Sequence, residues 1–337
     1  MTLDPPDAKR IQDLILHAQR IQVVSHVAPD GDAIGSLLGL GWLLRAQGKE
    51  PSLTCEDPVP DIYRWLPGSE EILPRGRGSY DLVISLDCSD PRRMGDVFEE
   101  DAAQGTLINV DHHVTNTQYG SVNWVDPSCV ATAQMILTLA DLLDWELTQQ
   151  VAVCLLNGLV TDTRSFRTSN VDTSAMQAAV RLMAAGASLS EVTRRALNQL
   201  PVSAVRLWGE AIHRMHLHDD VLWTEVTNAM RQRWSRGDDG TTGLTNFLSS
   251  VREAKVVVVF TERDDATVDV GMRAVPGYDV AQVALSLGGG GHPQASGCTL
   301  EGDLAEVRER VLAEIGRSLA QQRTDRRSLD LHGSSEG

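Results

Sequence analysis

Short apolar runs alternate with helical patterns through the first half of the chain. The apolar, largely β-branched runs predict four strands, at 21–26, 51–55, 81–87 and 105–111. Apolar positions at helical spacing predict helices at 33–48, 131–143, 148–160 and 174–185. Near-continuous apolar strands are typical of a parallel sheet that is buried on both faces. The alternation therefore predicts an α/β fold whose N-terminal domain has a doubly wound, mainly parallel sheet.

The pattern changes after Ala184. A helical stretch runs to about His216 and is followed by three strand candidates, at 221–227, 255–263 and 266–275. A helix at 279–287 precedes a glycine-rich segment, and a last helix is expected at 303–321. The predicted domains are a catalytic domain at 1–186, a helical connector at 187–216, a smaller α/β substrate-binding domain at 217–322 and a disordered tail at 323–337.

Composition places the chain among soluble globular proteins, with 42% hydrophobic and 23% charged residues in 337. No apolar run reaches membrane-spanning length, and the N-terminus lacks the apolar core of a secretory signal. The five Cys residues are odd in number, scattered and without a Cys-x-x-Cys pair. We therefore expect a cytoplasmic protein with no membrane partner, no disulfides and no thiolate zinc.

The formal net charge of −16 limits the partners. A protein that grips long nucleic acid usually has a basic face, because phosphate contacts supply most of the affinity. The acidic excess favours a small substrate, or a site in which bound cations supply the positive charge. Most of the 46 acidic residues are expected only to keep the chain soluble.

Residues that can bind metals follow the predicted strands and one later apolar segment. They are His26, Asp30, Asp32, Asp87, Asp111, His112, His113 and Asp162. Residues beyond the carboxyl ends of the strands of an open α/β sheet converge on one crevice. Carboxylate and imidazole together suit a divalent cation such as Mn²⁺, and four Asp side chains balance two such ions. Asp87, alone at its strand end, is the natural bridge between two cations about 3.5–4 Å apart.

Each segment also has a structural explanation. Pro-Asp-Gly at 29–31 is a turn sequence, Asp32 could cap the following helix, and Asp87 or Asp162 alone could begin a loop. The adjacent His112 and His113 are harder to explain by packing. We expect His112 to bind a metal, and Asp111 to accept the N–H of a neighbouring imidazole. His113 would lie beside a scissile phosphate as hydrogen-bond donor or general acid.

A second cluster lies near the C-terminus, in "LGGGGHPQASG" at 287–297. The backbone N–H groups of Gly289, Gly290 and Gly291 could form an anion-binding nest, with His292 as a further donor. The alternative is a flexible loop before a strand. Arg273 is a candidate second contact for an anion, although it could equally be a surface residue. The segment is not a P-loop, because no Gly-Lys-Ser/Thr follows.

Five motifs taken together resemble a known family. "HVAPDGDAIGS", "SLDCSD", "VDHH" and "TDT" resemble, in this order, the four motifs of the DHH phosphoesterase superfamily. "LGGGGHPQASG" resembles the signature of the DHHA1 domain, and the layout over about 10–320 is similar to bacterial nanoRNase and pAp-phosphatase proteins. The resemblance implies two domains with the active site in the cleft between them, and Mn²⁺-dependent hydrolysis of phosphoesters.

The resemblance also implies residue roles. One metal would take His26, Asp30 and Asp87, and the other Asp32, Asp87, His112 and Asp162. A water or hydroxide between the metals would attack phosphorus, with Asp87 and His113 as the catalytic residues. The phosphate would be held by His113, Arg273 and the loop from Gly289 to His292. Arg93 matches an Arg that follows the second motif in many relatives, but Arg92 beside it leaves the assignment open.

The chain departs from the family pattern at three positions. Many relatives have Gly where this chain has Arg164, and Ser near the positions of Gly271 and Ala274. These changes concern substrate preference and leave the proposed metal ligands intact.

The sequence thus favours a phosphodiesterase for RNA of about two to five nucleotides, with pAp 3′-phosphatase activity as a second reaction. Cyclic dinucleotides or their linear products are the nearest alternative substrates, and a non-catalytic nucleotide-binding module is the alternative of another class. The acidic charge disfavours a RecJ-like enzyme acting on long DNA. The glycine loop, in place of a basic pocket, disfavours a pyrophosphatase. Oligomeric state stays open, with a homodimer as one option.

Overall fold

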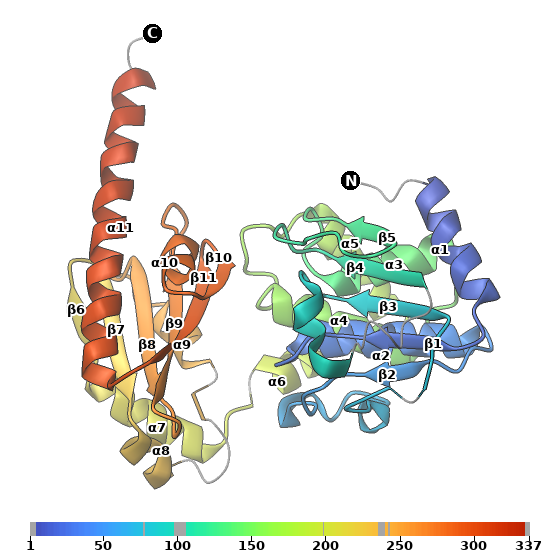
Figure 1. Ribbon diagram of the computed structural model, residues 1–337, viewed down its shortest axis with the longest axis horizontal. Coiled ribbons are helices and arrows are strands. Elements are labelled where there is room, and N and C mark those ends of the chain that lie inside the picture. The colour runs from blue at the N-terminus through green and yellow to red at the C-terminus, as the bar shows by residue number, and fades with distance from the viewer. Residues whose placement is uncertain are drawn as a thin grey trace. The chain divides into compact units, whose positions relative to one another are not determined.

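The computed structural model describes residues 5–76, 78–97, 106–197, 199–234, 240–241 and 243–333. The chain divides into two compact units, Met1–Gln199 and Leu200–Gly337 (Figure 1). Each has its own sheet and its own hydrophobic core. The finer domain boundaries stay a prediction.

Five parallel strands form the sheet of the first unit, in the order β2-β1-β3-β4-β5 (Figure 1). The strands are β1 (Ile21–Val24), β2 (Ser52–Thr54), β3 (Leu82–Leu86), β4 (Thr106–Asp111) and β5 (Val122–Val125). Strands β1 to β4 correspond to the four strands predicted from the sequence, which are thereby confirmed together with the α/β fold class. The edge strand β5 was not predicted, because its buried and half-buried positions alternate and it has no continuous apolar run.

Helices cover this sheet and supply most of the core. They are α1 (Pro5–His17), α2 (Gly31–Ala46), α3 (Thr132–Leu142), α4 (Gln149–Asp162), α5 (Thr173–Ala184) and α6 (Leu189–Leu197). Three short 3-10 turns are η1 (Asp61–Tyr63), η2 (Ser69–Glu71) and η3 (Pro91–Val97). Alternate strand residues face opposite sides: Val23 joins the large core with the helices, and Val24 packs with Met94 of η3.

Glycines on one stripe of α2 bring this helix very close to α4. Gly31, Gly35 and Gly39 are spaced by four residues and therefore share a face. A Cβ added at Gly35 would lie 2.5 Å from the carbonyl oxygen of Cys154 on α4. No side chain fits there, so the glycines permit a contact that places the start of α2 beside the end of α4.

The second unit is built on a six-stranded mixed sheet in the order β10-β11-β9-β8-β7-β6, in which β7 and β8 are parallel. Its strands are β6 (His216–His218), β7 (Val221–Val226), β8 (Val256–Glu262), β9 (Thr267–Ala274), β10 (Gly290–His292) and β11 (Ala295–Glu301). Its helices are α7 (Val202–His213), α8 (Asn228–Trp234), α9 (Leu244–Leu248), α10 (Ala281–Ser286) and α11 (Leu304–Gly333). The three predicted strands are β7, β8 and β9.

Both faces of this sheet are covered. Val256 and Val258 of β8 pack on the side of α10 and α11, and Val257 and Val259 pack on the side of α7, α8 and α9. The short elements β6, α8 and α9 were not predicted, because three to seven residues show no measurable periodicity. The last helix also continues past its predicted end at 321 to Gly333, into the segment expected to be disordered.

Among the described residues, no helix combines the length and the apolar character that crossing a lipid bilayer requires.

Candidate metal centre

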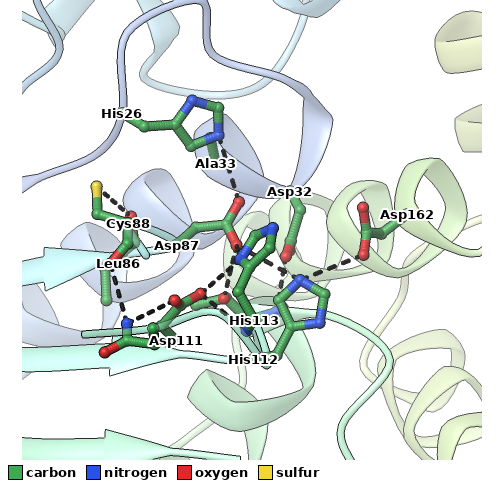
Figure 2. Close-up of polar contacts among 12 residues, drawn as sticks. His26, Asp32, Ala33, Leu86, Asp87, Cys88, Asp111, His112, His113 and Asp162 are labelled. Atoms are coloured by element: carbon green, nitrogen blue, oxygen red, sulfur yellow. Dashed lines mark hydrogen bonds and ion pairs between the residues drawn. The ribbon is translucent and has the colours of Figure 1, made fainter. Parts of the chain in front are cut away.

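Three neighbouring strands bring their polar residues to one edge of the first sheet. Strand β1 leads into His26, β3 ends one residue before Asp87, and β4 ends immediately before His112. These strands are parallel and adjacent, so their carboxyl ends meet. Figure 2 shows the side chains of His26, His112 and His113 gathered around Asp87.

Asp87 is the centre of this cluster and is almost completely buried. Its Oδ2 lies 3.5 Å from Nε2 of His26, and its Oδ1 lies 3.6 Å from Nε2 of His112. The same Oδ1 lies 3.5 Å from Nδ1 of His113 and accepts a 3.0 Å hydrogen bond from the Thr132 hydroxyl. Both carboxylate oxygens therefore face imidazoles, as expected of a carboxylate placed to bridge two cations.

The backbone at Asp87 is unusual. Its φ of 61° is in the left-handed region, which few residues other than glycine adopt without cost. Asp and Asn are among the residues that tolerate it best. The strand stops there, and the chain turns while the Asp87 N–H still donates to the Val110 carbonyl on β4. Such strain is common at functional sites that the surrounding structure holds in place.

Two carboxylates come from the start of α2. Asp30 is the N-cap residue, and its Oδ1 accepts hydrogen bonds from the N–H groups of Asp32 and Ala33 at 2.9 and 3.0 Å. The sequence had left a capping role open for Asp32, but Asp30 has that role because its side chain precedes the first helical turn.

Asp32 has no exposed surface and is held by three donors. Its Oδ2 accepts from the N–H of Thr132 at 2.6 Å, and its Oδ1 accepts from the N–H of Ala133 at 3.0 Å and from the Ser36 hydroxyl at 3.1 Å. The backbone N–H groups at the start of α3 stabilise the carboxylate. These donors could not be predicted from the sequence, because an N–H at a helix start is independent of residue type.

Asp162 follows the helix predicted at 148–160, whereas His26, Asp87 and His112 follow strands. It is the last residue of α4, so it does not follow a strand. Its Oδ2 lies 3.4 Å from Nε2 of His112. The close packing of α2 and α4 brings it to the same edge as Asp32 (Figure 2).

The other ring nitrogens fix how the imidazoles are presented. Nδ1 of His26 donates to the Val27 carbonyl at 2.8 Å, and Nδ1 of His112 donates to the Cys129 carbonyl at 3.3 Å. This tautomer leaves each Nε2 with a lone pair for a metal.

His113 is oriented differently. Its Nδ1 donates to Oδ1 of Asp111 at 2.7 Å. Asp111 is completely buried and is itself fixed, since its Oδ2 accepts from the Asn116 side chain at 2.6 Å and its Oδ1 from the His113 N–H at 3.2 Å. Asp111 therefore contacts His113 and fixes the orientation of its imidazole ring, without itself facing the cluster.

These groups could bind divalent cations. Three overlapping sets each offer ligand atoms within 4.8 Å of one another: His26 with Asp30 and Asp87, Asp32 with His112 and Asp162, and Asp87 with His112 and His113. Asp87 and His112 each belong to two sets. Carboxylate oxygens with imidazole nitrogens are a donor set that suits Mn²⁺ and similar ions, so the residues fit such metals.

The buried carboxylates of the cluster shift one another's pKa values. Burial, with the charges of Asp87, Asp162 and Asp30, raises the pKa of Asp32 well above its usual value. Burial also raises the pKa of Asp162 to about 7, even though the charge of His112 opposes the shift. Burial acts the same way on Asp87, but its hydrogen bond with His26 and the charges of the three imidazoles outweigh it and lower its pKa. These shifts reflect an excess of buried carboxylate charge, which divalent cations would neutralise.

Comparison with known proteins agrees with this geometry. Residues 20–159 match the family described as "DHH family, N-terminal domain", and residues 229–321 match the "DHHA1 domain". The chain is 38% identical to the bifunctional oligoribonuclease and PAP phosphatase NrnA of Thermus thermophilus over 306 residues, 89% of this chain and 90% of that protein. The chain belongs to the DHH–DHHA1 phosphoesterase family. It is a hydrolase of phosphoesters.

Solved structures share the fold of this DHH phosphoesterase. An exopolyphosphatase-related protein from Bacteroides fragilis superposes with a TM-score of 0.89 at 23% identity, over 95% of this chain and 98% of the other. RecJ from Thermus thermophilus in complex with Mn²⁺ superposes with a TM-score of 0.54 at 14% identity, over 94% of this chain and 56% of RecJ.

Of the two candidate arginines after the second DHH motif, Arg93 contacts a proposed metal ligand, His26. Its guanidinium NH2 lies 3.0 Å from Nδ1 of His26, and its carbonyl accepts from the Val27 N–H at 2.7 Å. Arg92 instead pairs with Asp90 at 2.9 Å and is largely exposed. The sequence could not separate the two, because the difference depends on the path of η3.

The DHHA1 candidates lie together in the second unit. Arg273 is on β9, opposite Ala295 of β11, and its Nε donates to Oδ1 of Asn246 at 2.7 Å. The glycine run is not simply a loop, because Gly290–His292 is the edge strand β10 of a hairpin with β11.

Two of these glycines are required by close packing. A Cβ at Gly289 would lie 2.2 Å from the Gly297 carbonyl oxygen, and one at Gly291 would lie 2.5 Å from that of Ala295. Hairpin packing therefore explains part of the glycine pattern by itself, and the anion nest stays a prediction.

Proposed function

We propose that this protein is a Mn²⁺-dependent phosphodiesterase that hydrolyses RNA of about two to five nucleotides and also removes the 3′-phosphate of pAp. The observation that carries the proposal is the membership of Asp87 in two sets of ligand atoms, since a carboxylate has one oxygen for each of two neighbouring cations. The Thermus relative, named an oligoribonuclease and PAP phosphatase, supports the substrate class.

In this proposal His26, Asp30 and Asp87 hold one cation, and Asp32, Asp87, His112 and Asp162 hold the other. When bound, the two cations supply an activated water and neutralise negative charge on the phosphate. The chain's own contribution is to hold the donors rigidly, with Asp32 fixed by the start of α3 and Asp87 fixed by its turn.

His113 is proposed to donate a hydrogen bond or a proton to the reacting phosphate. Asp111 holds the ring through Nδ1 and keeps it beside Asp87. Arg93 is proposed as a further phosphate contact, since its guanidinium already lies beside a metal-binding imidazole. Arg273 and the segment from Gly289 to His292 are proposed to bind another part of the substrate.

The net charge of −16 is consistent with a short substrate. Two cations and a few arginines neutralise the phosphates of a dinucleotide or pAp locally, whereas a long chain would need a basic track over the surface.

A substrate panel tests the proposal. Purified protein with Mn²⁺ is incubated with pApA, a short RNA pentamer, pAp and cyclic di-AMP, and the products are separated by chromatography. We expect turnover of the linear compounds. Hydrolysis of cyclic di-AMP alone would assign a different substrate class, and no turnover of any phosphoester would favour a nucleotide-binding module.

Asp87→Asn tests the metal centre itself. The amide keeps the shape and the tolerance of the left-handed backbone but loses the charge that attracts two cations, so turnover should fall by at least about a hundredfold. Asp90→Asn is the matched control, because Asp90 pairs with the exposed Arg92 and belongs to none of the three sets of ligand atoms. Both variants should show the wild-type far-UV circular dichroism spectrum, and equal activity of the two would refute the assignment.

A further inference from the structure

The side chain of Asn116 joins the two segments that carry Asp87 and His113. Asn116 lies in the segment that follows β4, and its Nδ2 donates to Oδ2 of Asp111 at 2.6 Å. The same Nδ2 donates to the Cys88 carbonyl at 3.1 Å. Asp111 precedes the two histidines, and Cys88 follows Asp87, so one amide reaches both segments.

The partners of Asn116 allow only one orientation of its amide. An ionised carboxylate and a carbonyl can only accept, so Nδ2 has to face Asp111 and Cys88. Oδ1 accepts from the N–H of Gln118 at 2.7 Å and from Nδ2 of Asn109 at 2.9 Å. Both hydrogens of the amide and both lone pairs of its oxygen are therefore used. An aspartate at this position would place an oxygen against two acceptors, so it could not take over the role.

Asp111 depends on this amide for one of its two oxygens. The carboxylate has no exposed surface, and buried carboxylate oxygens need hydrogen-bond donors. Its Oδ1 accepts from Nδ1 and from the backbone N–H of His113, and its Oδ2 accepts from Asn116. Without the amide, Oδ2 has to turn toward another donor. The His113 ring, which Asp111 holds, then turns with it.

The second acceptor of Asn116 ties the turn at Asp87 to the same amide. The Cys88 carbonyl accepts from Asn116 at 3.1 Å and from the Tyr119 hydroxyl at 3.0 Å. Cys88 follows directly on the left-handed backbone of Asp87, whose Oδ1 lies 3.5 Å from Nδ1 of His113. One side chain thus fixes both partners of this contact, the Asp87 carboxylate through its backbone and the imidazole through the carboxylate that holds it.

We propose that Asn116 is a positioning residue, which sets the His113 imidazole relative to Asp87 for the reaction at the phosphate. This inference rests on the proposed function, in which His113 donates to the reacting phosphate. Asn116 acts through Asp111 and the Cys88 carbonyl, and it need not touch the substrate or a cation. It therefore affects the chemical step and not the affinity for either.

Turnover of pApA by Asn116→Ala is the first test, with Asn123→Ala as the matched control. Asn123 belongs to the same group of amides, and its side chain bonds Asn109 at 3.1 Å and Gly120 at 2.7 and 2.9 Å. We expect Asn116→Ala to lower kcat by about 10- to 100-fold, with KM and Mn²⁺ affinity changed by less than about twofold. Asn123→Ala should keep the wild-type kcat even if its unfolding midpoint falls. An equal loss of kcat in both variants would overturn the inference.

A double-mutant cycle shows whether Asn116 acts through His113. If it does, Asn116→Ala lowers kcat by less than about twofold in the His113→Ala background. A structural role that is independent of the imidazole would give the same fall in both backgrounds, which would refute the inference. Asn116→Asp should lose at least as much kcat as Asn116→Ala, because its oxygen would repel the Asp111 carboxylate. Wild-type kcat in Asn116→Asp would contradict the assigned role.

The Nδ1 proton of His113 gives a readout that needs no turnover. An imidazole N–H that is bound to a carboxylate resonates far downfield in the proton NMR spectrum. In metal-free protein with isotope-labelled histidine, its signal is assigned by its loss in His113→Ala. The signal should persist in Asn123→Ala and should move upfield or disappear in Asn116→Ala. An unchanged signal in Asn116→Ala, or no such signal in the wild type, would refute the inference.

The inference and the proposed function can fail separately. If the wild type hydrolyses no phosphoester, the proposed function is wrong, and the NMR comparison alone decides whether Asn116 positions His113. If the wild type turns over pApA and Asn116→Ala retains the wild-type kcat, the proposed function stands and the inference is wrong.

Discussion

The contact between Gly158 on α4 and Asp32 on α2 links helix packing to the metal centre, and Gly158→Ala tests that link. A Cβ at Gly158 would lie 2.5 Å from Oδ1 of Asp32 and 2.6 Å from the Cβ of Ala133. Ordinary contact begins near 3.4 Å, so the carboxylate has to move by about 0.9 Å. The hydrogen bonds that hold Asp32 are 2.6 to 3.1 Å long and would not survive such a shift.

The expected magnitude follows from three effects. Overpacking a tight core costs about 1–3 kcal/mol, and a lost hydrogen bond to a buried charge costs about 1.5–3 kcal/mol. The better helix propensity of alanine returns only about 0.5–1 kcal/mol. The net loss of about 1.5–5.5 kcal/mol corresponds to a fall of about 3–20 °C in the unfolding midpoint for a unit of this size. Since Asp32 moves relative to His112 and Asp162, Mn²⁺ affinity should fall by about 10- to 100-fold.

The assay is titration of metal-free protein with Mn²⁺ by calorimetry, together with thermal unfolding. Gly39→Ala is the matched control on the same interface, because its Cβ would meet only the Leu155 side chain, 2.4 Å from Cδ2 and 2.9 Å from Cγ, and neither backbone nor a metal ligand. Gly39→Ala should lose some stability and keep the wild-type Mn²⁺ affinity. Wild-type affinity in Gly158→Ala, or an equal loss in both variants, would refute the idea that this glycine positions Asp32.

Three further predictions concern the same centre. Asp111→Asn should lower kcat/KM by about 10- to 100-fold with Mn²⁺ affinity nearly unchanged, because Asp111 acts on His113; an equal loss of metal binding would contradict that role. Chelation should abolish turnover and lower the unfolding midpoint by several degrees, with recovery on adding Mn²⁺, and an unchanged midpoint would argue against a metal centre. Mn²⁺ affinity should be weaker at about pH 6 than at about pH 8, because the pKa of Asp162 is raised to about 7 and the metal must displace its proton. Calorimetry at both pH values checks this prediction. Equal affinity would count against Asp162 as a ligand.

The sequence was most informative where residue type alone carries the signal. Apolar runs predicted four of the five parallel strands because those strands are buried on both faces. His26, Asp87 and His112 could be grouped without a structure, because parallel strands deliver their carboxyl ends to one edge.

What the sequence could not show depends on distances between backbones. Asp162 belongs to a helix end, and it joins the cluster only because glycines let α2 and α4 approach closely. Thr132 and Ala133 hold Asp32 through N–H groups that every residue except proline possesses. No residue pattern marks such donors in advance.

At Asp87, residue type and backbone geometry both constrain the choice of residue. The turn demands a residue that tolerates φ of 61°, and the cations demand a carboxylate between His26 and His112. Glycine satisfies the first demand and glutamate only the second, whereas aspartate is short enough to reach the cluster and tolerates the left-handed region. Asparagine keeps the backbone and loses the charge, and alanine adds strain as well. Asp87→Ala should therefore be less stable than Asp87→Asn when both are metal-free, because both lose the charge but alanine tolerates the left-handed backbone less well.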